Sequence, residues 1–220
     1  MLTFDCYGTL VDWEQGIGAA FRAVAAEIGK SVELPPVLRA YHEIEPAVQA
    51  ETFRSYREVL TETARRLAIR LGWALPTTRA GFLAESVPTW PTFPDTNAAL
   101  ERLAAAGYRL GILSNVDDDL LAGTRRRLAP CFDPALIVTA QQVHSYKPAL
   151  AHFEIARSRI GTGRWLHVAQ SLFHDIAAAR RFGVPVVWIN RRGERPASPS
   201  GAEAEFPTLE AFADWAIRSG

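Results

Sequence analysis

The sequence predicts a Rossmann-like, doubly wound α/β fold, in which a parallel sheet carries an inserted unit of four helices. Three observations predict this fold class. A short apolar run at residues 2–4 ends at an acid and a glycine turn, which is typical of a strand buried on both faces. Residues 13–90 then carry helical patterns alone. From residue 95 onward strand and helix patterns alternate, as in a parallel sheet with crossover helices.

The insert begins with a helix whose apolar residues recur at 3.6-residue spacing and which stops at Gly29. A second helix starts near Pro35, and Pro46 is expected to kink or end it. A third helix ends at Gly72, and a shorter fourth one spans residues 77–86. Three prolines between residues 88 and 94 then predict a rigid connector back to the sheet.

The second half of the chain is predicted from its strand and cap signals. Strands are expected at residues 108–113, 136–139, 165–169 and 184–189, each followed by a helix. Asp95 is expected to cap the helix that ends at Gly107, and the acidic run 117–119 to open another helix. We interpret this run as solvated capping rather than a metal site. Residues 194–205 are expected to form a polar surface loop, and a terminal helix follows.

Composition narrows the classes of function. With 220 residues, 48% apolar and 22% charged, the chain can bury a large core. Its formal charge is +0 and no basic run is interleaved with aromatics, so no nucleic-acid partner is expected. No stretch reaches the ~18 apolar residues of a membrane span, and the first strand leaves no room for a signal peptide. We therefore expect a cytoplasmic protein with no membrane partner, acting on a small molecule.

Four polar positions lie at or just beyond the carboxyl ends of predicted strands: Asp5, Ser114 with Asn115, Lys147 and Asp175. Loops that leave these ends converge at one edge of an open sheet, where ligands bind. Lys147 is one of only two lysines among 24 basic residues, which fits a site that needs a compact ammonium rather than a guanidinium. Each position also has a structural alternative as a turn, a helix cap or a surface charge.

Residues 5–12, Asp-Cys-Tyr-Gly-Thr-Leu-Val-Asp, resemble the first motif of the haloacid dehalogenase superfamily, and the other three positions match its later motifs in order. In that superfamily the first aspartate is a covalent nucleophile. The resemblance implies this role for Asp5, a hydrogen bond to it from Thr9, and a Lys147 that keeps Asp5 ionised and orients water together with Asp175. It also implies that residues 13–92 form a helical cap over a core made of 1–12 and 93–220.

Tyr7 indicates which branch of the superfamily the chain resembles. Phosphatases of the superfamily carry a second aspartate two residues after the nucleophile, and a phenol with a pKa near ~10 is a poor substitute for it. Tyrosine there is similar to the type II 2-haloacid dehalogenases, which implies hydrolysis of an (S)-2-halo acid through an aspartyl ester, with no cofactor. Mg²⁺ is expected only if the phosphatase alternative holds, and Ser171 stands where that alternative favours a second acid.

The resemblance also implies which groups bind a small carboxylic acid substrate. Ser114, Asn115 and the backbone amides of Cys6 and Tyr7 are expected to hold its carboxylate. Ser171 and His174 are expected to replace a Ser-x-Asn of the fourth motif, and His174 is a candidate proton carrier near neutral pH. The two cysteines, Cys6 and Cys131, lie far apart and predict neither a disulfide framework nor a zinc site.

Glu45 departs from the pattern of the dehalogenase branch. It falls near the position where that branch has an arginine that receives the departing halide, and an anion there would repel halide. Arg39, Arg54 or Arg57 could supply the missing cation from elsewhere in the insert. The departure makes a non-catalytic binding protein on the same fold a further alternative, beside the Mg²⁺-dependent phosphatase. Relatives are commonly dimeric, so a homodimer is one alternative for the assembly.

Overall fold

A computed structural model describes residues 1–219 of the chain. Its centre is a sheet of six strands in the order β3-β2-β1-β4-β5-β6, and every neighbouring pair is parallel. This order is that of a doubly wound sheet, so the predicted fold class is confirmed. The strands are β1 (Leu2–Phe4), β2 (Leu110–Ser114), β3 (Phe132–Thr139), β4 (Leu166–Ala169), β5 (Val186–Ile189) and β6 (Ala204–Phe206).

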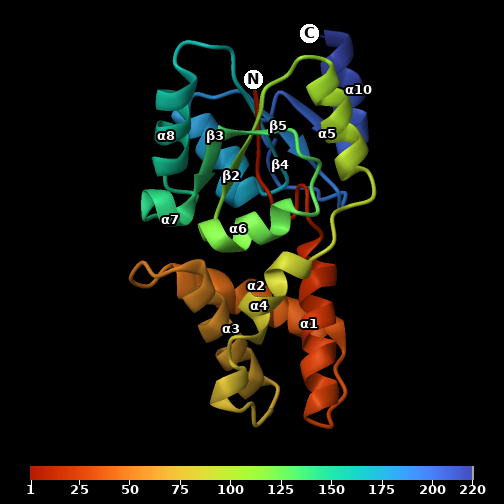
Figure 1. The fold of residues 1–220 in the computed structure, drawn as a ribbon, viewed down its shortest axis with the longest axis vertical. Helices are drawn as coiled ribbons and strands as arrows, with labels where there is room; N and C mark the ends of the chain where they lie inside the picture. The colour runs from red at the N-terminus through yellow and green to blue at the C-terminus, as the bar shows by residue number, and fades with distance from the viewer. Residues whose placement is uncertain (220) are drawn as a thin grey trace.

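Helices cover both faces of this sheet, and side chains alternate between two cores. Leu2 and Phe4 of β1 belong to the core under the helices α5 (Thr96–Ala105) and α10 (Leu209–Ser219). Trp188 of β5 lies in the second core with Phe153, under the helices α8 (Ala151–Ile160) and α9 (Ala177–Phe182). Figure 1 shows α8 and α10 on opposite sides of the sheet. The short helices α6 (Asp118–Arg125) and α7 (Ala140–Val143) complete this part.

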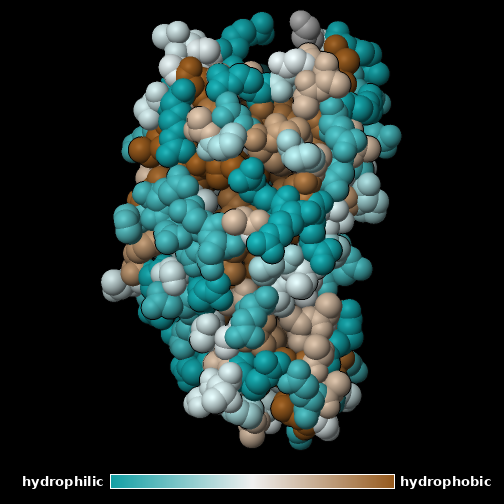
Figure 2. Space-filling model, in the orientation of Figure 1, coloured by the Kyte–Doolittle hydropathy of each residue, from teal (hydrophilic) through white to brown (hydrophobic). Residues whose placement is uncertain are grey.

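The insert gathers at one end of the molecule, beyond the carboxyl ends of the strands (Figure 1). It consists of α1 (Trp13–Glu27), α2 (Leu34–Gln49), α3 (Tyr56–Arg70) and α4 (Phe82–Ser86), with single 3-10 turns at Thr77–Arg79 and Val87–Thr89. The expectation that α2 ends at Pro46 is wrong, because α2 continues through Pro46 to Gln49. Figure 2 shows hydrophilic side chains over most of this face of the molecule.

Two expected helix caps belong to other helices than predicted. Asp95 makes no side-chain cap on α5. Its carboxylate instead accepts from the backbone N–H of Leu209, at 2.6 Å, where α10 begins. Asp117 likewise accepts from the backbone N–H groups of Tyr56 and Arg57, at 2.9 and 2.8 Å, and so caps α3 of the insert. Both caps join segments that are distant in sequence, which a local pattern does not reveal.

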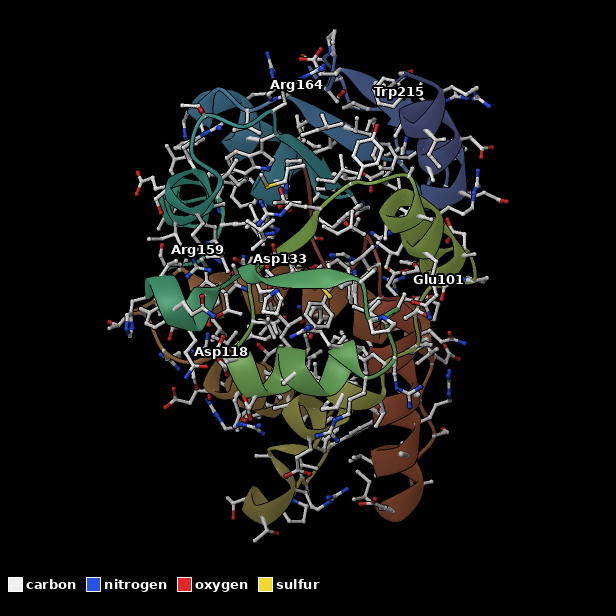
Figure 3. All side chains as sticks on the ribbon, turned by 45° about the horizontal axis from the view of Figure 1, so that its top comes forward. Glu101, Asp118, Asp133, Arg159, Arg164 and Trp215 are labelled. Carbon is white, nitrogen blue, oxygen red and sulfur yellow. The ribbon has the colours of Figure 1, made fainter. Side chains whose placement is uncertain are left out.

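The remaining departures are small. Asp118, labelled at the start of α6 in Figure 3, accepts from the Thr139 hydroxyl at 2.7 Å and from Gln142 at 2.8 Å. The predicted surface loop at residues 194–205 ends in the edge strand β6, which pairs with β5. Trp215 of α10, also labelled in Figure 3, packs on Phe206 of β6 with ring centroids 5.6 Å apart.

Candidate active site

Asp5 lies one residue beyond β1, the central strand, where the chain leaves the sheet toward the insert. It is 7% exposed, and its two carboxylate oxygens have different donors. Thr9 Oγ1 donates to Oδ2 at 2.9 Å, and Lys147 Nζ donates to Oδ1 at 2.9 Å. Thr9 Oγ1 in turn accepts from the backbone N–H of Gln170 at 2.9 Å. The hydroxyl is therefore oriented with its proton toward Asp5, as expected for a group that holds this carboxylate in one position.

Lys147 is the cation at the centre of the site, and it is only 1% exposed. Its ammonium has three N–H donors and three acceptor partners, which are Asp5 Oδ1 at 2.9 Å, the Leu113 carbonyl at 2.8 Å and Asp175 Oδ1 at 2.6 Å. Asn115 fixes the lysine's backbone, because its side chain donates to the Lys147 carbonyl at 3.0 Å and accepts from the Lys147 N–H at 2.7 Å. Lys147 thus joins two buried carboxylates from different loops.

A buried chain of hydrogen bonds, absent from the sequence predictions, supports Asp175. Trp165 Nε1 donates to Thr3 Oγ1 at 2.7 Å, and Thr3 Oγ1 lies 2.9 Å from His167 Nδ1. His167 Nε2 lies 3.0 Å from Asp175 Oδ1. With the Thr3 proton directed to Nδ1, His167 donates from Nε2 to Asp175, and each polar side-chain atom in this chain of hydrogen bonds has a partner. Thr3 and His167 are partners in the β1–β4 register, so the sheet itself assembles this chain.

The two carboxyl groups differ in acidity for physical reasons. Burial is the largest influence on both, and it raises the pKa of Asp5, although Lys147 and Thr9 oppose the shift. Asp175 interacts with the charge of Lys147 and accepts hydrogen bonds from both Lys147 and His167, and these contacts hold the pKa of Asp175 below its usual value. The two carboxylates raise the pKa of Lys147 despite its burial. The ammonium is therefore retained at neutral pH, with Asp175 as its stronger partner.

A cavity of about 340 Å³ opens on this cluster. Strand-end residues form one wall: Asp5, Tyr7, Ser114, Asn115, Lys147, Gln170, Ser171, His174 and Asp175. Residues of the insert form the other wall: Trp13, Tyr41, His42, Glu45, Pro46, Gln49, Tyr56 and Trp90. The cavity therefore brings together every predicted site residue except Cys6 and Thr9.

Comparison with known proteins identifies the family. The model of the haloacid dehalogenase-like hydrolase family matches residues 1–183. The chain belongs to the haloacid dehalogenase-like hydrolases. Its relatives include an (S)-2-haloacid dehalogenase of Pseudomonas sp. (strain YL), 30% identical, with 87% of this chain and 83% of that protein covered. The (S)-2-haloacid dehalogenase 4A of Burkholderia cepacia is 29% identical, with 94% of this chain and 87% of that protein covered.

Solved structures agree on the fold. The L-2-haloacid dehalogenase from Xanthobacter autotrophicus with chloropropionic acid covalently bound has a TM-score of 0.83 at 17% identity, covering 98% of this chain and 97% of that one. A putative hydrolase of the same family from Bacillus subtilis, bound to magnesium, has a TM-score of 0.82 at 17% identity, covering 97% and 96%. Because both kinds of relative share the fold, the chemistry has to be argued from the residues of this chain.

In this hydrolase the Tyr7 side chain lines the cavity. Its hydroxyl lies 2.9 Å from Thr124 Oγ1 of α6, and its ring meets Trp90 edge to face with centroids 5.7 Å apart. Burial raises the pKa of Tyr7 well above its ordinary value, so the phenol stays neutral. A phenol with so high a pKa releases its proton poorly, so Tyr7 is a poor replacement for the second aspartate of phosphatases as an acid–base group.

The predicted substrate-binding residues occupy distinct places. Ser114 Oγ is buried, faces no partner among residues 1–219, and lines the cavity. Both atoms of the Asn115 amide are engaged by Lys147, which leaves one Nδ2 hydrogen free. Ser171 Oγ lies 3.1 Å from His174 Nδ1, and burial lowers the pKa of His174. The Cys6 side chain is fully buried and lies outside the cavity wall.

The opposite wall of the cavity carries a carboxyl group. Glu45 of α2 is 6% exposed, and burial raises the pKa of Glu45 to about 7. Arg39 is exposed, while Arg54 and Arg57 pair with Glu51 and Asp119. None of these three arginines lines the cavity, so the expectation that one replaces the missing cation is wrong.

The arginine that does line the cavity, Arg192, was not predicted. It follows β5, pairs with Glu14 of α1 at 2.6 Å, and lies over the Trp13 ring at 5.5 Å. His152 is fully buried beside Ser114, with its Nε2 3.2 Å from the Ser114 carbonyl. Sequence offered no signal for Arg192, because the contact depends on how the insert rests on the sheet.

Two negative findings apply to residues 1–219. No cluster of three or more His, Cys, Asp or Glu side chains is placed to hold a metal ion. No helix in this range is both long and apolar enough to cross a bilayer.

Proposed function

We propose that this hydrolase removes the halogen from a small 2-halo carboxylic acid of (S) configuration, through a covalent ester on Asp5 and without a metal or other cofactor. The observation that carries the proposal is a buried carboxylate on the wall of a cavity, with Lys147 as its cation and a tyrosine where phosphatases have an acid. The (S)-2-haloacid dehalogenases among its relatives support the substrate class.

In the first step one carboxylate oxygen of Asp5 attacks C2 of the substrate, and the carbon–halogen electron pair leaves with halide. The configuration at C2 inverts, so an (S) acid gives an (R) product. Ser114 Oγ and the backbone amides of Cys6 and Tyr7 are suited to hold the substrate carboxylate. Neither amide donates to another group among residues 1–219, and the Ser114 hydroxyl is equally unpaired.

In the second step water attacks the ester carbonyl carbon of Asp5, and the acyl–oxygen bond breaks to release the 2-hydroxy acid. Lys147 and Asp175 would orient this water. His174 is a suitable proton acceptor, since its lowered pKa keeps it neutral at pH 7 and it lines the same cavity. Ser171 holds its ring through Nδ1.

We further propose that residues 13–92 form a cap domain on a core of 1–12 and 93–220. The two passages of the chain between these parts lie side by side, because Asp12 N–H donates to the Pro91 carbonyl at 2.8 Å and Phe93 N–H to the Leu10 carbonyl at 3.1 Å. A cytoplasmic location and a homodimer stay predictions.

The test is a single-turnover reaction with excess enzyme and (S)-2-chloropropionate in heavy-oxygen water, followed by peptide mass analysis. We expect one labelled oxygen on the peptide that contains Asp5, and chloride release that Asp5→Asn abolishes without loss of folded structure. Label found only in the product would refute the covalent step. Phosphate release from monoesters that requires added Mg²⁺, with no halide release, would instead support the phosphatase alternative.

A further inference from the structure

The insert contributes the wall of the cavity that faces the nucleophile, and this wall has no lysine or arginine of its own. Arg192, which lines the cavity from the residues after β5, is paired with Glu14. In a displacement at carbon the leaving group departs on the side opposite the attacking atom. Asp5 stands at the strand ends, so the leaving group points toward the insert, where Tyr41, Glu45 and Gln49 of α2 and Tyr56 of α3 line the cavity. Figure 1 shows α2 and α3 below the strand ends.

These side chains form two neighbouring hydrogen-bonded pairs. The hydroxyls of Tyr41 and Tyr56 lie 3.2 Å apart. Gln49 Nε2 donates to Glu45 Oε1, which holds the carboxyl group in place from the next turn of α2. All three acidic side chains are at least nine-tenths buried. A group this buried, without a cation, is stable in its neutral form.

The charges that face Glu45 favour that neutral form as well. Across the cavity Asp5, Lys147 and Asp175 sum to one negative charge when both carboxyl groups are ionised. Arg192 and Glu194 also line the cavity; Arg192 is paired with Glu14, and Glu194 is a further carboxyl group. Tyr146, on the loop before Lys147, lies within reach of the Glu45 charge, and burial raises the pKa of Tyr146 so that the phenol stays neutral. Burial raises the pKa of Tyr41 and of Tyr56 too, so the tyrosines do not titrate near neutrality.

We propose that Tyr41, Glu45 and Tyr56 form a leaving-group site of neutral O–H donors, which makes 2-fluoro acids the preferred substrates of this chain. The inference rests on the proposed function and deepens it. Fluoride is the smallest halide and the best hydrogen-bond acceptor among them, and it leaves carbon only with such help. Chloride and bromide are weak acceptors that depart without it, so neutral donors assist them little.

The step is balanced without a further reactant. A carboxylate oxygen of Asp5 forms the bond to C2, the carbon–fluorine bond breaks, and fluoride leaves with the electron pair. Glu45 keeps its proton and shares it in a hydrogen bond to the departing fluoride. Hydrogen-bond donors aimed at a developing charge are worth about 10²-fold in rate each, which sets the size of the effect.

The test compares fluoride release from (S)-2-fluoropropionate with bromide release from (S)-2-bromopropionate in matched variants. Glu45→Met removes the donor at nearly constant volume, and we expect about a 100-fold lower kcat for fluoride release with less than about a 5-fold change for bromide. Glu45→Gln keeps an N–H donor and should stay within about 10-fold of the wild type on both. Glu43→Gln, an exposed position on the same helix, is the control.

The pH profile separates a donor from a structural role. Fluoride release by the wild type should fall as pH rises through about 7, where Glu45 ionises, and Glu45→Gln should remove this fall. His42 and His174 also line the cavity and are unchanged in that variant, so they cannot account for the difference.

The inference would be overturned if Glu45→Met lowered kcat equally on both substrates, or if fluoride release did not depend on residue 45. Bromide release by the wild type would in that case still support the proposed function. Absence of both halides from the wild type would instead end both proposals.

Discussion

Replacing Lys147 with methionine tests whether the centre of the site is held by charge. The side chain is 1% exposed and bonds to two carboxylates, at 2.9 and 2.6 Å. Removing one partner of a buried ion pair costs about 3–5 kcal/mol, because the remaining charge has lost its compensation. For a domain of this size each kcal/mol corresponds to roughly 2–4 °C, so we expect the melting temperature to fall by about 10 °C.

The loss of stability in Lys147→Met is expected to depend on pH. In the wild type the pKa of Asp175 is lowered by folding, so its stabilisation is present above the unfolded value and lost as pH falls through the folded value. In Lys147→Met both carboxyl groups keep their burial without the cation, so their pKa values rise on folding. Their contribution then favours the folded state at low pH and is lost as pH increases. The variant should therefore lose less stability at pH 4.5 than at pH 7.5.

The assay is urea unfolding at these two pH values, followed by circular dichroism, alongside halide release. Lys30→Met is the matched control, since Lys30 is the other lysine of the chain and is exposed. We expect no measurable change in stability or turnover for the control, and no turnover in Lys147→Met. A loss of stability equal at both pH values, or a gain at pH 7.5, would refute the ion-pair argument.

Three further outcomes follow from the geometry. Thr3→Val removes the acceptor of Trp165 and the partner of His167, and should lower kcat about 10-fold with KM unchanged, as measured by steady-state halide release. Asp117→Asn weakens the cap of α3 and should cost about 1 kcal/mol in urea unfolding. The acid limb of kcat/KM should lie above the usual range of a carboxyl group, because burial raises the pKa of Asp5 and the ionised form reacts; a limb below pH 4 would contradict this.

Most of the fold could be predicted because short local sequence patterns specify its helices and strands. The apolar runs at β1, β2, β4 and β5 end at turn residues, and the helical insert has continuous 3.6-residue patterns. Strand β6 was missed because Ala-Glu-Phe is short, half polar, and defined only by its pairing with β5. Pro46 was misjudged because it lies in the last turn of α2, where Ala50 still bonds to its carbonyl.

The site was predictable where it depended on strand ends. Asp5, Lys147 and Asp175 meet because parallel strands deliver their following loops to one edge. The support beneath them depends instead on register and burial. A threonine in β1 and a histidine in β4, both inside apolar strands, were a usable signal, since a buried polar group needs a partner. Which partner each finds follows only from the pairing of the strands.

In the proposed mechanism, that support lets the site tolerate the ester intermediate. When Asp5 becomes the proposed ester it loses its negative charge, and Lys147 loses one of its two carboxylate partners. Asp175 still holds the ammonium at 2.6 Å, and His167 supplies a second donor that keeps Asp175 ionised through the change. A cation paired with Asp5 alone would be buried and uncompensated at this stage, which costs several kcal/mol. The hydrogen bonds from Trp165 through Thr3 and His167 thus place the permanent charge of the site on the carboxylate that does not react.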